Sequence, residues 1–134
     1  MKHLLVFKPR DIIADLDLNM VENMMNPTKD MVSVFHNEKM LCVAGINHLR
    51  TGVVEAWLIS SNEINNCKFT FYKTMKRLID FCFETMGIHR LEIAVDCNWM
   101  EGDKWARSLG LKYESITRSY DFNHRDHAIY VRIE

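Results

Sequence analysis

Four side chains near the carboxyl end of the chain are of types that bind metal ions. His124 and His127 have an H-x-x-H spacing, and Asp121 and Asp126 lie beside them. Imidazole and carboxylate groups are ordinary zinc ligands, provided that the backbone holds them in place. This spacing falls on a predicted hairpin turn, with no helix to fix both rings. We therefore predict a solvated turn at these residues and no metal site.

The cysteines show no spacing typical of metal or redox sites. Cys42, Cys67, Cys82 and Cys97 form no C-x-x-C pair, and two of them lie inside apolar runs. The apolar run near the N-terminus has only four residues, too short for a signal peptide or a membrane span. We therefore expect a protein that stays in the cytoplasm, with four reduced thiols that fill core space.

Size and charge restrict the number of domains and the kinds of partner. The chain has 134 residues, of which 48% are hydrophobic and 26% charged, as in a globular protein. This length is that of one domain, so we predict a single domain over residues 1–134. The net charge of −1 argues against nucleic acid and anionic membranes as partners.

Apolar periodicity predicts an α/β fold with a mixed central sheet of about seven strands and helices on both faces. Residues 40–46 are nearly all apolar, as in a strand buried on both faces. Apolar side chains between residues 69 and 86 recur with the period of an amphipathic helix. The predicted elements are a strand at 3–7, two short helices between 11 and 25, strands at 31–36, 40–46 and 53–60, a helix at 69–86, a strand at 90–96, a helix at 103–109, and strands at 112–120 and 128–133.

This β-α-α-β-β-β-α-β-α-β-β order resembles that of the GNAT family, the acetyl-CoA-dependent N-acetyltransferases. Lys39–Gly45 is similar to the family's third strand and Val53–Ser60 to its fourth. Trp105–Glu114 resembles the family's late motif, aromatic-Tyr-x-x-Leu-Gly-Phe-x-x-Glu. The resemblance implies transfer of an acetyl group from acetyl-CoA to an amine, carried by a small molecule or a protein.

The resemblance also implies where acetyl-CoA binds. In the family, the fourth strand pairs with the pantetheine, and a glycine-rich loop at a helix N-terminus holds the pyrophosphate. The matching loop here, residues 60–71, has no glycine, so asparagines would adopt any positive φ angle. The alternative is that Ser60 and Glu63 cap a short helical turn and no phosphate binds. The expected cofactor residues are Leu58, Ile59, Ser60, Asn65, Asn66, Lys68, Thr70, Asn98 and Trp105.

The resemblance assigns the general base to Glu55 on the fourth strand. The alternative for Glu55 is an ion pair with a Lys or Arg of a neighbouring strand. The family's general acid is a tyrosine, and the matching position here is Ala106, which has no proton to donate. Tyr113 and Tyr120, on the next predicted strand, are the candidates to replace it, with Tyr113 preferred. The alternative is that both are amphipathic strand residues with a hydrated hydroxyl.

A narrower resemblance concerns phage proteins. Ala56–Ile64, Asn98 and Ser108–Gly110 are similar to the small internal virion protein of short-tailed bacteriophages. It implies a phage-encoded protein located in the host cytoplasm or the virion. The alternative to an acetyltransferase is thus a non-catalytic GNAT-fold protein that acts as a virion component or binds a host protein. A homodimer through edge strands or the methionine-rich segment at 20–25 is compatible with either hypothesis.

Overall fold

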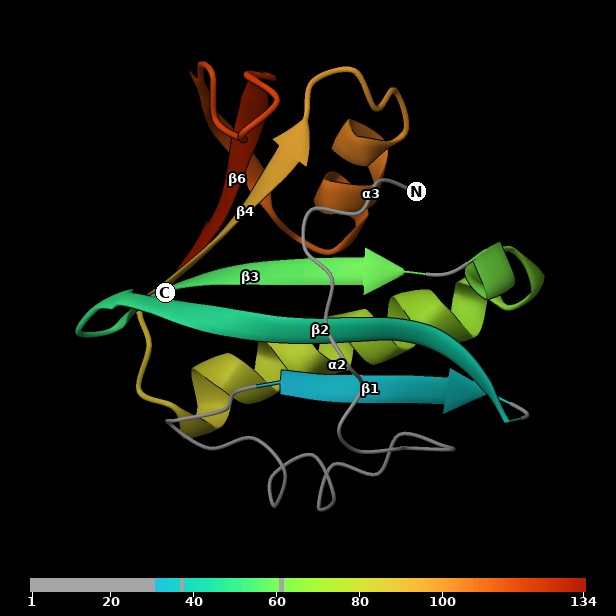
Figure 1. Cartoon of the computed structure of the whole chain (residues 1–134). Helices are drawn as coiled ribbons and strands as arrows, with labels where there is room; N and C mark the ends of the chain where they lie inside the picture. The colour runs from blue at the N-terminus through green and yellow to red at the C-terminus, as the bar shows by residue number, and fades with distance from the viewer. Residues whose placement is uncertain (1–30, 37, 61) are drawn as a thin grey trace. The chain divides into compact units, whose positions relative to one another are not determined.

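The structure, a computed structural model, describes residues 31–36, 38–60 and 62–134 (Figure 1). The strand predicted at 3–7 and the helices predicted between 11 and 25 lie outside these residues. The described strands form one sheet in the order β1-β2-β3-β4-β6-β5. The elements are β1 (Met31–His36), β2 (Lys39–Arg50), β3 (Val53–Ser60), the 3₁₀ helix η1 (Asn62–Asn66), α2 (Lys68–Thr85), β4 (Arg90–Asp96), α3 (Gly102–Ser108), β5 (Lys112–Thr117) and β6 (His127–Ile133).

The predicted bounds of β1, β3 and β4 are confirmed, whereas β2, β5 and β6 differ from prediction. β6 begins at His127, one residue before its predicted start. β2 runs to Arg50, four residues beyond the predicted end at Ile46. The backbone of residues 47–50 continues the strand, but their side chains are exposed, so a pattern of buried apolar residues does not predict this part of β2. β5 ends at Thr117, before the predicted end at Tyr120, because the chain turns through Ser119 at a φ of 52°.

Contacts divide the chain into two compact units. The first unit comprises the described residues up to Asn47 together with those of Trp57–Phe81. Within it, β1 pairs antiparallel with β2, and Leu41, Cys42 and Val43 are at most 2% exposed, which confirms a strand buried on both faces. The apolar positions of α2 in this unit are buried at the predicted helical spacing, and they are Phe71, Met75, Leu78 and Ile79.

The second unit, His48–Ala56 with Cys82–Glu134, holds the candidate site. Its β6 lies between β4 and β5 and runs antiparallel to both. The start of β3 runs parallel to β4, where Val54 is opposite Leu91 and Glu55 is opposite Glu92. Paired residues share a face of a sheet, and successive residues alternate between faces. This register therefore places Glu55 and Leu91 on opposite faces.

One face of this unit, the α3 face, packs against α3, which lies beside the strands in Figure 1. The α3 face carries Leu91 of β4, Tyr130 of β6 and Tyr113 of β5. The hydroxyl of Tyr130 donates a hydrogen bond to Oδ1 of Asp103 in α3 at 2.5 Å. The other face, the Glu55 face, carries Glu55, Glu92 and His127. The sheet itself therefore separates the side chains of the Glu55 face from those of the α3 face.

α3 approaches β4 closely because its first residue is glycine. Gly102 is buried, and a Cβ built on it would lie 2.3 Å from Cγ1 of Val95 and 2.8 Å from a ring carbon of Trp99. Carbon atoms do not approach so closely without displacement. A hydrogen is the only side chain that this packing accepts.

No helix in residues 31–134, as far as the structure describes them, is both long and apolar enough to cross a membrane.

We predict that Gly102→Ala destabilises the protein by about 1–3 kcal/mol, because the added methyl group overpacks the contact with Val95 and Trp99. Without that contact, alanine would stabilise a helix relative to glycine by about 1 kcal/mol. The sign of the change in urea or thermal unfolding therefore tests the packing. Lys104→Ala, on the exposed side of α3, is the control, with an expected change of less than about 0.5 kcal/mol. A stabilised Gly102→Ala variant would contradict the packing.

Candidate functional site

Glu55 meets a tyrosine hydroxyl on its face of the sheet. The hydroxyl of Tyr120 donates a hydrogen bond to Oε2 of Glu55 at 2.6 Å, across 65 positions of sequence. This is a short, charge-assisted hydrogen bond to a carboxylate, which is among the stronger kinds in proteins. The bond fixes one carboxylate oxygen and leaves the other, Oε1, for a further partner.

Tyr120 keeps its proton because of this environment. Burial, followed by the hydrogen bond to the Glu55 carboxylate and the negative charges of Glu55 and Glu92, raises the pKa of Tyr120 above its ordinary value. The phenol is therefore neutral at physiological pH and acts as a donor. Tyr120 follows β5, so it is not the strand residue that the sequence offered as the alternative, and its hydroxyl donates to Glu55.

The neighbouring carboxylate, Glu92, is held differently. Arg90 Nε donates to Oε2 of Glu92 at 3.0 Å, and its two terminal nitrogens donate to Glu114 at 2.9 and 2.6 Å. The hydrogen bond with Glu114, followed by the one with Glu92, outweighs burial and raises the pKa of Arg90. Arg90 thus pairs with both Glu92 and Glu114, and its single positive charge offsets one of their two negative charges. Glu55 bonds to a hydroxyl, and the ion pair that the sequence offered as its alternative is not found among the residues that the structure describes.

The segment from Tyr120 to His127 is ordered around one carboxylate. Asp121 Oδ1 accepts hydrogen bonds from the amides of Asn123 and Arg125, at 3.0 and 3.1 Å. Its Oδ2 lies 2.8 Å from Nε of Arg125 and 3.1 Å from Nε2 of His127. Burial by itself would raise the pKa of Asp121, but these hydrogen bonds outweigh it and the pKa is well below its ordinary value. Asp121 is therefore ionised.

The solvated turn predicted for this segment is wrong at His127. His127 is the first residue of β6, is opposite Asp96 in the register, and is 0% exposed. His124, by contrast, is exposed and has a φ of 62°. The residues that the structure describes include no group of three or more ligand side chains placed to hold a metal ion. Burial of His127 depends on where β6 packs, and the local sequence, which is polar, carries no sign of it.

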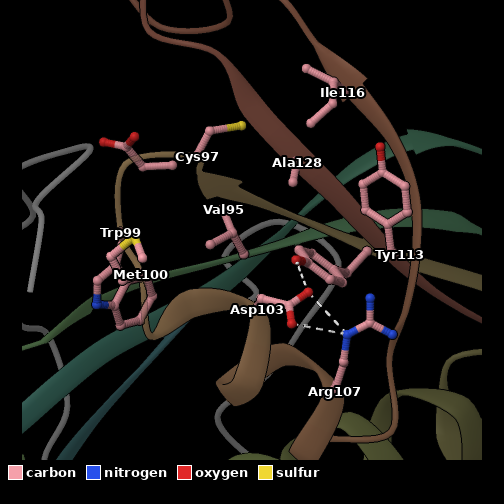
Figure 2. Close-up of a pocket in the computed structure, with 11 residues that line it drawn as sticks. Val95, Cys97, Trp99, Met100, Asp103, Arg107, Tyr113, Ile116 and Ala128 are labelled. Atoms are coloured by element: carbon pink, nitrogen blue, oxygen red, sulfur yellow. Dashed lines mark hydrogen bonds and ion pairs between the residues drawn. The ribbon is translucent and has the colours of Figure 1, made fainter.

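A cavity of about 460 Å³ opens on the α3 face (Figure 2). Tyr113 lines it, and the Tyr113 ring packs edge-on against Tyr130 at 5.9 Å between centroids. Asp103 and Arg107 of α3 form an ion pair at 2.9 Å along the same cavity. The lining residues are Val95, Asp96, Cys97, Trp99, Met100, Asp103, Arg107, Tyr113, Ile116, Ala128 and Tyr130. Tyr113 and Glu55 thus lie on opposite faces of the sheet.

Not all of the cysteines fill core space as predicted. Cys42 and Cys82 are buried, and burial raises the pKa of the Cys42 thiol to about 12. Cys97 is exposed at the cavity, because β4 has ended one residue earlier. All four are free thiols, as expected.

The residues expected to hold acetyl-CoA fall in both units. Asn98 and Trp105 belong to the second unit. The backbone amide of Asn98 donates to Oδ1 of Asp96 at 2.9 Å, and the ring centroids of Trp105 and Trp99 lie 6.0 Å apart. The remaining residues belong to the first unit, at the end of β3, in η1 and in the first turn of α2. They are Leu58, Ile59, Ser60, Asn65, Asn66, Lys68 and Thr70.

The glycine-free loop forms a short helix and not a nest of positive φ angles. Asn65 and Asn66 lie in η1, and the non-glycine residues with positive φ among those described are Glu38, Ser119 and His124. The helical turn that the sequence offered as the alternative is therefore present. α2 begins at Lys68, directly after the loop, and its first turn has no acidic side chain.

Comparison with known proteins identifies the fold. No protein-family profile matches the chain, and no curated protein sequence matches it. Solved structures do match. A ribosomal-protein-S5-alanine acetyltransferase from Vibrio fischeri has a TM-score of 0.62 at 17% identity, over 71% of this chain and 55% of that one. A GNAT-family acetyltransferase from Bacillus anthracis has a TM-score of 0.67 at 12% identity, over 86% and 71%.

A third match, a ribosomal L7/L12 alpha-N-protein acetyltransferase solved with coenzyme A, has a TM-score of 0.66 at 17% identity, over 77% of this chain and 60% of that one. The chain thus spans a little over half the length of the first of these enzymes. At such identities the likeness concerns the fold. The chain has the mixed α/β fold of the GNAT N-acetyltransferases.

Proposed function

We propose that the protein is an N-acetyltransferase in which Glu55 is the general base. The observation that carries this proposal is the hydrogen bond of 2.6 Å between Tyr120 and Glu55, formed on a strand of a GNAT fold. A general base must be held in one orientation and must be ionised when the acceptor arrives. Tyr120 provides the orientation by binding one oxygen of the carboxylate.

Glu55 then acts on the acceptor amine. Its Oε1 takes a proton from the acceptor ammonium, directly or through one water molecule, and so produces the neutral amine that can attack a carbonyl carbon. Acetyl-CoA, when bound, supplies the acetyl group as a thioester, so that an N–C bond replaces the C–S bond and the thiol leaves with a proton. The negative charges of Glu55 and Glu92 near Tyr120 favour a cationic acceptor.

The residues of the first unit fit an anion at the start of α2. The first turn of α2 contains Lys68 and Thr70, both exposed, and no acidic side chain that would repel a phosphate. Free amides and a partial positive charge at a helix N-terminus favour anions even without glycine. We therefore propose that Lys68 and Thr70 bind the pyrophosphate of acetyl-CoA.

A second candidate function, a non-catalytic GNAT-fold protein that acts by binding, is supported by two observations. η1 occupies the place of the glycine-rich loop. Ala106, which stands where the family has its general-acid tyrosine, is 0% exposed and belongs to the core. Under this hypothesis the partner is a host or virion protein, as the resemblance to the phage virion protein implies.

We predict that Glu55→Gln lowers kcat/KM for acetyl transfer by at least about 100-fold, because glutamine cannot accept the proton. The measurement uses labelled acetyl-CoA with a panel of peptides bearing free N-termini, lysine peptides and polyamines. Glu84→Gln, an exposed carboxylate on α2, is the matched control and should retain wild-type activity. If no member of the panel is acetylated by the wild type at millimolar acetyl-CoA, the binding hypothesis takes precedence.

Tyr120→Phe should lower kcat about tenfold, the worth of one hydrogen bond to a charged group. The KM for acetyl-CoA should stay unchanged, since the phenol contacts the base and not the proposed pyrophosphate site. An unchanged kcat would remove Tyr120 from the proposed site.

We predict that isothermal titration detects binding of both acetyl-CoA and free CoA. Lys68→Ala should weaken that binding about fivefold, equivalent to one exposed charge contact of about 1 kcal/mol. Lys76→Ala, another exposed lysine of α2, is the control and should leave the affinity unchanged. Equal losses in both variants would indicate a general charge effect rather than a pyrophosphate site at the first turn.

A further inference from the structure

Tyr120 lies outside the helices and strands. β5 ends at Thr117, and the chain passes through a turn before it reaches Tyr120. The Tyr120 amide donates to the carbonyl of Arg125 at 2.8 Å, which closes the segment onto itself. A tyrosine on such a segment reaches a fixed partner only if its neighbours hold the ring.

The neighbour that contacts the ring is His127. The two ring centroids lie 4.7 Å apart with the planes tilted by 36°. His127 is itself immobilised, because it is the first residue of β6, lies opposite Asp96 and is 0% exposed. The Tyr120 ring thus packs against a buried ring whose position is fixed by β6.

A buried histidine at this position has an unusual cost. Its Nε2 lies 3.1 Å from Oδ2 of Asp121, but its buried Nδ1 has no hydrogen-bond partner in the part of the chain that the structure describes. A buried polar atom left unpaired destabilises the folded state, and an apolar side chain of similar size would avoid that cost. The bond to Asp121 is what a histidine supplies here and an apolar ring does not.

Asp121 in turn connects Tyr120 and His127 to the framework. Its carboxylate accepts hydrogen bonds from Asn123, Arg125 and His127, and it is adjacent to Tyr120 in sequence. Arg125 continues the network, since its terminal nitrogen lies 3.2 Å from Oδ2 of Asp96 at the end of β4. Tyr120 is therefore connected, through Asp121, to β4 by Arg125 and to β6 by His127.

We propose that Asp121 and His127 are positioning residues for the Glu55–Tyr120 pair. Asp121 closes the 120–127 segment and holds the His127 ring, and that ring holds Tyr120 with its hydroxyl against Glu55. Neither residue touches the reacting atoms. The inference rests on the proposed function for its catalytic consequence, but the positioning itself can be measured without activity.

The test follows the Tyr120 hydroxyl by NMR, in protein labelled with ¹³C at the tyrosine Cζ, whose chemical shift reports hydrogen bonding of the phenol. Tyr120→Phe assigns the Tyr120 signal, and Glu55→Ala provides its position without the bond. In Asp121→Asn and His127→Phe we expect the signal to move to the Glu55→Ala position. The signals of Tyr72, Tyr113 and Tyr130 should stay in place, which shows that the fold is intact. His124→Asn, on the same segment, is the control and should leave the Tyr120 signal unchanged, since asparagine tolerates the positive φ at this exposed position.

If the Tyr120 signal stays at its wild-type position in both variants, the proposal is overturned.

A second measurement needs no variant. The ¹⁵N spectrum of the wild type should show the proton of His127 on Nε2, facing Asp121. An imidazole with the proton on Nδ1 and a bare Nε2 cannot bond to an ionised carboxylate, and that result would also overturn the proposal.

The kinetic consequence separates this inference from the proposed function. If the protein is an acetyltransferase, Asp121→Asn should lower kcat by up to about tenfold, no more than Tyr120→Phe does, with an unchanged KM for acetyl-CoA, as expected for a residue that acts through Tyr120. If the Tyr120 signal moves but the wild type transfers no acetyl group, the proposed function fails and the positioning stands. If the wild type is active and the signal does not move, the positioning alone fails.

Discussion

The register of β6 is the constraint on which the candidate site depends. β6 pairs along its whole length with β4, from Arg90 opposite Ile133 to Asp96 opposite His127, and its other edge pairs with β5. A shift of one residue would exchange the two faces of the strand. His127 would then leave the Glu55 face, and Tyr130 would leave Asp103. Both the Glu55 site and the cavity are therefore consequences of one strand alignment.

The two faces of the second unit have different chemistry. The Glu55 face carries the hydrogen bond between Tyr120 and Glu55 and the hydrogen bonds of Asp121 with Arg125 and His127. The α3 face carries an aromatic and aliphatic cavity in which Asp103, Arg107 and Tyr130 satisfy one another. Groups that bind and move protons are thus kept apart from the apolar cavity by the sheet.

The chain combines a GNAT fold with departures from the family pattern at two positions. By the resemblance, the 3₁₀ helix η1 corresponds to the glycine-rich loop and the buried Ala106 to the general-acid tyrosine. Each departure replaces a functional feature by an ordinary structural one, a helical turn or a packed methyl group. The Glu55–Tyr120 pair has no such structural explanation, because a solvent-exposed hydrogen bond replaces bonds to water and contributes little to stability. For that reason the pair, rather than the fold, carries the functional argument.

The local sequence determined the elements whose residues interact mainly with their own neighbours or with the core as a whole. Alternation and helical periodicity predicted β1, β3, β4 and the buried side of α2, because burial acts on each side chain independently of its partner. The helices predicted at 69–86 and 103–109 end within one residue of their predicted ends, before Gly87 and Gly110 at φ angles of 65° and 86°, a conformation that few residues other than glycine adopt readily. The GNAT fold and Glu55 followed from resemblance to the family, not from the residues alone.

The tertiary structure alone decided what Glu55 bonds to and that His127 is buried. Tyr120 and Glu55 are 65 positions apart, and the residues around each are ordinary turn and strand residues. His127 and Asp121 read as a polar turn, because nothing local shows that β6 inserts between β4 and β5. Side chains acquire such roles through the register of distant strands. That register is set by the packing of the whole sheet and not by any segment of it.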